Sequence, residues 1–71
     1  MLMYTITAYE KGNPEMKHVF KVYKNRRSRD SSAYEVELDG EFFTTGESRK
    51  DCIEEIMLHI AYMEWLHLIP M

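Results

Sequence analysis

The residues of this chain best suited to chemistry are Cys52, Glu55 and His59, which are spaced i, i+3 and i+7. On a helix, this spacing places all three on a common side. A thiol near a helix N-terminus has a lowered pKa, and histidine is the usual base for a nucleophilic cysteine. Two helical turns nevertheless separate Cys52 from His59 by roughly 10 Å, which is beyond the reach of a proton transfer. We therefore expect no enzyme activity.

Glu55 and His59 are also the best candidates for metal ligands, because they are spaced i, i+4. A helical zinc motif needs a second histidine at the proper spacing, and here His18 would have to arrive from a strand. A solvated Glu-His pair is the simpler interpretation. We predict no metal and no cofactor.

Length and composition indicate one domain, residues 1–71, with a modest core. Hydrophobic residues make up 45% of the chain and charged residues 30%, which is ordinary for a soluble globular protein. No apolar run approaches the roughly 20 residues needed to cross a bilayer, and the first ten residues lack the pattern of a signal peptide. The single cysteine, Cys52, fits a reducing compartment. We expect a cytoplasmic protein that does not bind membranes.

Alternating apolar residues predict strands at residues 2–9, 18–24, 34–38 and 42–45. The second of these is apolar on both faces, as in a central strand. Asp39-Gly40 is a two-residue hairpin signal, since both turn residues need positive φ. Residues 25–32 form an arginine-rich loop. The expected fold class is α+β, a three- to four-stranded, mainly antiparallel sheet followed by one C-terminal helix packed on it.

The predicted helix covers residues 49–68. Ser48 and Asp51 have the spacing of a capping box, and Pro70 ends the helix. One apolar stripe of this helix should face the sheet. The expected core includes Tyr4, Ile6, Phe20, Val22, Val36, Leu38, Ile53, Ile56, Ile60 and Met63.

A second apolar stripe on the same helix consists of Leu58, Tyr62, Trp65 and Ile69. Either the sheet wraps far enough around the helix to cover this stripe, or another protein surface does. Tryptophan and tyrosine are enriched at interface centres. We expect a homodimer, or docking on a partner, with Trp65 as the anchor.

Charge is divided sharply along the chain, although the net charge is only -3. All charged residues between Met16 and Arg29 are cationic, whereas acids predominate from Asp30 to Glu55. Either the basic and acidic strands lie side by side and neutralise one another, or they form two binding faces. The acidic hairpin comprises Glu35, Glu37, Asp39 and Glu41. The basic candidates are Lys21, Lys24, Arg26, Arg27 and Arg29.

The segment from Tyr34 to Ile60 resembles part of the HicB-type antitoxins. The resemblance rests on the hairpin from Tyr34 to Gly40, on Thr45-Gly46-Glu47-Ser48 and on the isoleucine-rich helix. HicB-type antitoxins are small bacterial and phage proteins in which a sheet with a helix binds and inhibits a toxin ribonuclease. The resemblance implies an inhibitory role. This chain departs from the family in ending at the helix, without a DNA-binding extension.

These features predict a small non-catalytic interaction domain, of the kind found among phage and mobile-element inhibitors of host enzymes or nucleoproteins. Anti-CRISPR, anti-restriction and antitoxin-like factors are examples. In this hypothesis the acidic hairpin imitates phosphates and occupies a basic channel in the target. The alternative is an RNA- or DNA-binding accessory protein that grips phosphates with the basic residues around loop 25–32.

Overall fold

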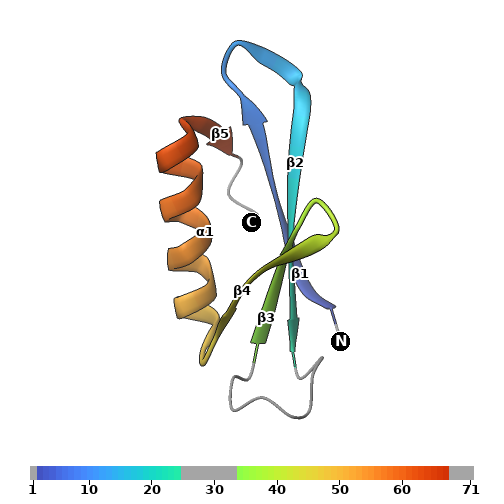
Figure 1. Ribbon diagram of the computed structural model, residues 1–71, viewed down its shortest axis with the longest axis vertical. Helices are drawn as coiled ribbons and strands as arrows, with labels where there is room; N and C mark the ends of the chain where they lie inside the picture. The colour runs from blue at the N-terminus through green and yellow to red at the C-terminus, as the bar shows by residue number, and fades with distance from the viewer. Residues whose placement is uncertain (1, 25–33, 68–71) are drawn as a thin grey trace.

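The computed structural model describes residues 2–24 and 34–67, which form an antiparallel sheet with one helix packed on it (Figure 1). In chain order the elements are β1 (Leu2–Glu10), β2 (Asn13–Lys24), β3 (Tyr34–Leu38), β4 (Glu41–Gly46), α1 (Arg49–Met63) and β5 (Trp65–His67). The strand order is β4-β3-β2-β1-β5, and all neighbouring pairs are antiparallel. The α+β class is confirmed, with five strands rather than the predicted three to four.

Alternate residues of the central strands provide the sheet side of the core. Ile6 on β1 is paired with Phe20 on β2, and Val22 is paired with Val36 on β3. β2 has neighbours on both sides, as its two partly apolar faces predicted. The buried apolar residues are Ile6, Ala8, Phe20, Val22, Val36, Cys52, Ile56 and Ile60.

The predicted core was wrong at one position, and it left out two residues that are completely buried, Ala8 and Cys52. Met63, the last residue of α1, is 43% exposed and does not belong to the core. Ile53 is only half-buried, whereas Cys52, which we did not include, is completely buried. The helix therefore faces the sheet with Cys52, Ile56 and Ile60, a set spaced by four residues.

Local sequence determines the β3–β4 turn. Asp39 and Gly40 have φ values of 52° and 86°, so both turn residues adopt the positive φ that the Asp-Gly signal predicted. A register irregularity next to Val36 and Glu37 interrupts the ladder between β3 and β4. Phe43, at this irregularity, turns its ring toward the helix side and packs edge-on against Phe20 at a centroid distance of 5.7 Å.

The start of α1 is also determined locally. Ser48 has extended backbone angles, and its Oγ accepts a hydrogen bond of 3.2 Å from the Asp51 N–H. Ser48 is therefore the N-cap, as predicted. A Cβ atom at Gly46 would lie 2.8 Å from the Cys52 Sγ, so only glycine fits where β4 enters the helix.

The end of α1 differs from the prediction. We expected the helix to continue to residue 68, but it ends at Met63. Glu64 adopts a left-handed conformation with φ 58°, and its N–H donates to the Ala61 carbonyl. The chain then turns back as β5, which pairs with the last residues of β1. The apolar pattern continues past the helix because β5 also carries apolar residues, of which Trp65 is half-buried and Leu66 is 52% exposed.

Within residues 2–24 and 34–67, no helix has the length and apolar character that crossing a bilayer requires.

Candidate functional site

The structure does not bring Cys52, Glu55 and His59, the residues best suited to chemistry, together on one accessible surface. Cys52 is fully buried, whereas Glu55 is exposed to solvent. Burial, followed by the nearby Asp51 charge, raises the pKa of the Cys52 thiol. A protonated, inaccessible thiol is a poor nucleophile. Within the described residues, no group of three or more histidine, cysteine or acidic side chains has the arrangement of a metal site.

His59 lies among aromatic rings. Its ring centroid is 5.0 Å from that of Phe43, 5.4 Å from that of Trp65 and 6.1 Å from that of Phe20. The interplanar angles of these pairs lie between 68° and 77°, which is the edge-to-face arrangement that aromatic side chains favour. His59 therefore packs between α1 and the sheet and does not form a solvated pair with Glu55.

The acidic hairpin does not form one continuous exposed surface. Glu35 is only 4% exposed, so it does not share an exposed acidic surface with the other carboxylates, as the phosphate-imitation hypothesis requires. Glu37 is half-buried and lies opposite Lys21 across the β2–β3 ladder. Asp39 and Glu41 are exposed. Part of the basic strand thus lies beside part of the acidic strand, which was the first of our two alternatives for the charge division.

Lys21 and Lys24 are exposed on β2. The remaining basic candidates, Arg26, Arg27 and Arg29, lie outside the described residues.

The second stripe is divided between two elements. Leu58 and Tyr62 are on α1 and are 65% and 83% exposed. Trp65 lies on β5 instead of the helix and is half-buried, so it is not aligned with them. Ile69 lies outside the described residues. The prediction of one four-residue helical stripe was therefore wrong, because it required a helix that extends to residue 68.

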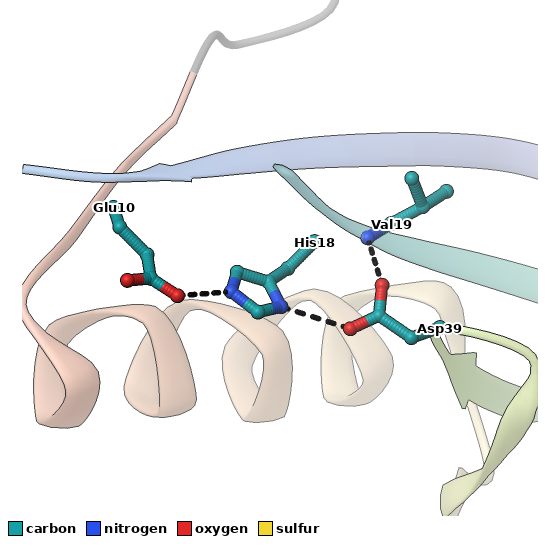
Figure 2. Close-up of polar contacts among 4 residues, drawn as sticks. All are labelled: Glu10, His18, Val19 and Asp39. Atoms are coloured by element: carbon teal, nitrogen blue, oxygen red, sulfur yellow. Dashed lines mark hydrogen bonds and ion pairs between the residues drawn. The ribbon is translucent and has the colours of Figure 1, made fainter. Parts of the chain in front are cut away.

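The structure reveals a polar cluster that the sequence pattern did not indicate, and we call it the His18 site. Its members are Glu10, His18, Asp39 and Trp65. The His18 Nδ1 lies 2.8 Å from the Asp39 Oδ2, and its Nε2 lies 2.9 Å from the Glu10 Oε2. Figure 2 shows the imidazole ring between the two carboxylates. The site joins the end of β1, the middle of β2 and the β3–β4 turn.

Two main-chain contacts hold Asp39 in the His18 site. The Asp39 Oδ1 accepts a hydrogen bond of 2.8 Å from the Val19 N–H (Figure 2). The Asp39 N–H in turn donates to the Val19 carbonyl at 2.9 Å. The Asp39 carboxylate thus binds the side chain of His18 and the main chain of Val19, which are consecutive residues on β2.

The two carboxylates favour the charged form of the imidazole. The hydrogen bond to Asp39, followed by that to Glu10, raises the pKa of His18, although partial burial opposes the shift. Burial of Asp39 by itself would raise the pKa of its carboxyl group. The hydrogen bonds from His18 and Val19 outweigh burial, and the pKa of Asp39 lies below its ordinary value.

Trp65 covers one face of the His18 ring. The two ring centroids are 3.9 Å apart and the rings are nearly parallel, with an interplanar angle of 5°. A cation over an indole face is attracted by the ring quadrupole. The stack therefore adds a second interaction that favours charged His18.

This geometry suits charge recognition within the protein better than catalysis. Both imidazole nitrogens are hydrogen-bonded to carboxylates, so neither has a free lone pair that could accept a proton from a substrate. Our sequence reasoning considered His18 only as a possible metal ligand. Asp39 and Trp65 are far from Glu10 and His18 in the chain, and no periodic pattern connects the four residues.

No family model, curated protein or solved structure matches this chain. The resemblance of residues 34–60 to HicB-type antitoxins therefore stays a prediction.

Proposed function

We propose that this chain is a small non-catalytic interaction domain that inhibits a host enzyme or nucleoprotein, as phage and mobile-element inhibitors do. The observation that supports the proposal is the exposure of Leu58 and Tyr62, at 65% and 83%, one turn apart on α1. The opposite side of this helix already packs on the sheet. Large apolar side chains that remain exposed on a folded surface are typical of contact sites.

The proposed contact surface is the outer face of α1, which we define as Glu54, Glu55, Leu58 and Tyr62. All four side chains are exposed. The two carboxylates come about one turn before Leu58, so the face is acidic at one end and apolar at the other. Such a face suits a target groove that combines an apolar pocket with cationic residues, as basic nucleic-acid channels do. This surface replaces the acidic hairpin as the main contact, because Glu35 is buried.

The test is capture of bacterial proteins on the immobilised chain, with a double variant and a matched control. Leu58→Ala with Tyr62→Ala removes both apolar anchors, and we expect captured partners to be lost. Met16→Ala, a change of another exposed apolar residue on β2, should leave capture unchanged. Capture that survives the double variant would reject this face as the contact surface.

Because Trp65 is stacked on His18, it is not aligned with Leu58 and Tyr62, and this weakens the case for a homodimer through the predicted stripe of Leu58, Tyr62, Trp65 and Ile69. We therefore favour a different protein as the occupant. Light scattering coupled to size exclusion tests this choice, because a stable dimer that the double variant dissociates would reverse it.

Nucleic acid binding stays the second candidate, and one observation favours it. The sheet face turned away from α1 carries Tyr9 opposite Lys17, with the Lys17 Nζ 6.0 Å from the centre of the Tyr9 ring. Lys21 and Tyr23 follow on the same face of β2. Aromatic and cationic side chains on a sheet bind single strands through stacking and phosphate contacts.

A gel-shift series with single-stranded RNA and DNA separates the two candidates. If nucleic acid binds, Lys17→Glu with Lys21→Glu should abolish the shift, whereas Lys50→Glu on α1 should not. An absence of any shift for the unmodified chain at low salt would reject this candidate.

A further inference from the structure

We propose that His18 is a proton-operated latch, which fastens β5 to the sheet while the imidazole is charged and releases Glu10 when the proton leaves. This inference does not depend on the proposed function. It concerns the conformation of the region where β1, β5 and the end of α1 meet.

The hydrogen bonds of the imidazole require the charged form. An imidazolium has two N–H donors, and the structure places one carboxylate oxygen within 2.9 Å of each nitrogen. A neutral imidazole keeps only one N–H, so its other nitrogen would present a lone pair to a carboxylate. Two acceptors at this distance repel each other. Loss of the proton therefore breaks one of the two contacts.

Glu10 is the partner that is released. Asp39 is also fixed by hydrogen bonds between both its side chain and its main chain and Val19. Among the described residues, the structure gives the Glu10 carboxylate a single hydrogen bond, that from His18. The proton that remains on a neutral His18 is therefore best placed on Nδ1, facing Asp39, and the Nε2 contact with Glu10 is lost.

Loss of the proton from His18 acts on β5 in two ways. Glu10 is paired with Trp65 in the β1–β5 ladder, which contains only three residue pairs. The Trp65 indole also stacks on the His18 ring, and neutral His18 no longer provides a cation for that stack. The other ring contacts of β5 are those of Trp65 with Phe20 and His59, and neither of them involves the end of β1. The last residues of β1 and the whole of β5 should therefore loosen together.

The charges around His18 favour a transition at a pH above the ordinary pKa of histidine. The nearest charges are both acidic: Glu10 from β1 and Asp39 from the β3–β4 turn. α1 contributes His59, whose ring touches Trp65, and β5 carries His67 opposite Ala8, the residue that also faces His18 on β2. These two histidines are the groups whose own titration could be mistaken for that of His18.

Solvent can reach the latch. An open cleft beside it is lined by residues of the β1–β2 turn and of the α1–β5 junction. Its lining comprises Glu10, Lys11, Gly12, Met63, Glu64 and Trp65. Because Glu10 and Trp65 both border this cleft, proton exchange at Nε2 requires no global unfolding.

The test combines two pH titrations of the whole chain. Imidazole NMR signals give the pKa of each of the three histidines, and Trp65, the single tryptophan, reports its own environment by fluorescence. We expect His18 to titrate above the ordinary histidine pKa. The Trp65 emission should change with the same midpoint, and amide hydrogen exchange in β5 should accelerate above it.

Four variants assign the transition to His18. Glu10→Gln removes one charged acceptor and should lower the midpoint of both signals, and because Glu10 is partly exposed this variant should fold. His18→Gln should abolish the Trp65 transition, whereas His59→Gln and His67→Gln should leave it in place. A Trp65 transition that follows His59 or His67, or an unchanged midpoint in Glu10→Gln, would overturn the proposal.

Discussion

The two ends of α1 are held by different kinds of interaction. At the N-terminal end, Ser48 caps the Asp51 N–H, and Gly46 makes room for the Cys52 sulfur, so these partners lie within residues 46–52. The Tyr4 hydroxyl of β1 also donates to the Arg49 carbonyl at 3.5 Å. At the C-terminal end, Glu64 takes a left-handed conformation and Trp65 stacks on His18, a residue of β2. The cap and the close packing of the first end depend on neighbours in sequence, with Tyr4 as one contact from the sheet, whereas the Trp65 contacts of the second end depend on the assembled sheet.

This difference predicts how each end responds to mutation and pH. Changes at the N-terminal end should act through helix capping and local packing, with little dependence on pH. Changes at the C-terminal end should act through the core and through the charge of His18. Substitutions at both ends and pH titration test this distinction, from the largest expected effect to the smallest.

Ile60→Ala should produce the largest loss, because it removes core packing near the C-terminal end of α1. Ile60 is 3% exposed, and truncation of a fully buried isoleucine to alanine costs about 2–5 kcal/mol. Urea denaturation measures the change in the free energy of unfolding. Leu58→Ala, an exposed control on the same helix, should stay within about 0.5 kcal/mol. Equal stabilities for the two variants would show that Ile60 does not anchor this end.

Gly46→Ala should destabilise the N-terminal end by about 1–3 kcal/mol through overpacking. The new Cβ would lie 2.8 Å from the Cys52 Sγ and 3.4 Å from the Cys52 nitrogen. Gly12→Ala is the matched control, since a Cβ at Gly12 has no atom within 4 Å. Thermal unfolding compares the two variants.

The double variant Gly46→Ala with Cys52→Ala sharpens the test. Removal of the sulfur provides space for the new Cβ, so the second substitution should cost less in the Gly46→Ala background than in the unmodified chain. Strict additivity of the two changes would mean that the sulfur contact is not the cause.

Ser48→Ala should lower the free energy of unfolding by about 1 kcal/mol, through loss of the N-cap hydrogen bond to Asp51. Ser48→Asp supplies an alternative cap and should retain most of the stability. Both values should be nearly the same at pH 6 and pH 8, because no histidine contacts this cap in the described residues. A large pH dependence of the Ser48→Ala effect would contradict the prediction that only the C-terminal end responds to pH.

Glu64→Gly should stabilise the C-terminal end by about 0.5–1 kcal/mol. Glu64 has φ 58°, a conformation that costs residues with a Cβ but not glycine. Glu64→Ala keeps this cost and should therefore not stabilise. If Glu64→Gly destabilises the protein in thermal unfolding, the Glu64 side chain contributes more to this end than its conformation costs.

The pH dependence of the His18 site should be the smallest effect, about 1 kcal/mol or less, because Glu10 and Asp39 are partly exposed. The pKa of His18 is higher in the folded than in the unfolded state, since Asp39 and Glu10 accept its hydrogen bonds. The contribution of charged His18 to the free energy of unfolding is thus complete below about pH 6.5, and it is lost as the pH rises through the folded-state pKa.

Asp39 has the opposite sign. Partial desolvation opposes the shift, but the hydrogen bonds from His18 and Val19 depress the pKa of Asp39, so its contribution to the free energy of unfolding is present above about pH 3.9 and is lost as the pH falls. Urea denaturation between pH 3 and pH 9 should therefore show a stability maximum. In His18→Gln, the alkaline decline should be absent.

Several features of the fold could be predicted because their physical causes are local. The Asp39-Gly40 turn depends on the φ preferences of two adjacent residues, and the Ser48 cap depends on one side chain and one nearby N–H. Alternation also predicted the inward positions of Ile6, Phe20, Val22 and Val36, because side chains on a strand alternate between its two faces.

The candidate site could not be predicted in the same way. His18 acquires its charge partners only because β1 pairs with β2 and the β3–β4 turn lies beside Val19. Glu35 alternates with apolar residues as a solvent-facing residue would, yet it is buried within the sheet. Periodicity indicates which residues share a face of one element, but it does not indicate what covers that face.

By itself, the sequence determined the α+β class, the turn at Asp39-Gly40 and the beginning of α1, because contacts between nearby residues decide these features. Only the tertiary structure decided where α1 ends. The same apolar pattern could have continued the helix or formed β5, and Glu64 adopts the left-handed conformation because the edge of β1 and the ring of His18 are available to Trp65. Those partners lie more than forty residues earlier in the chain, so no local signal could reveal them.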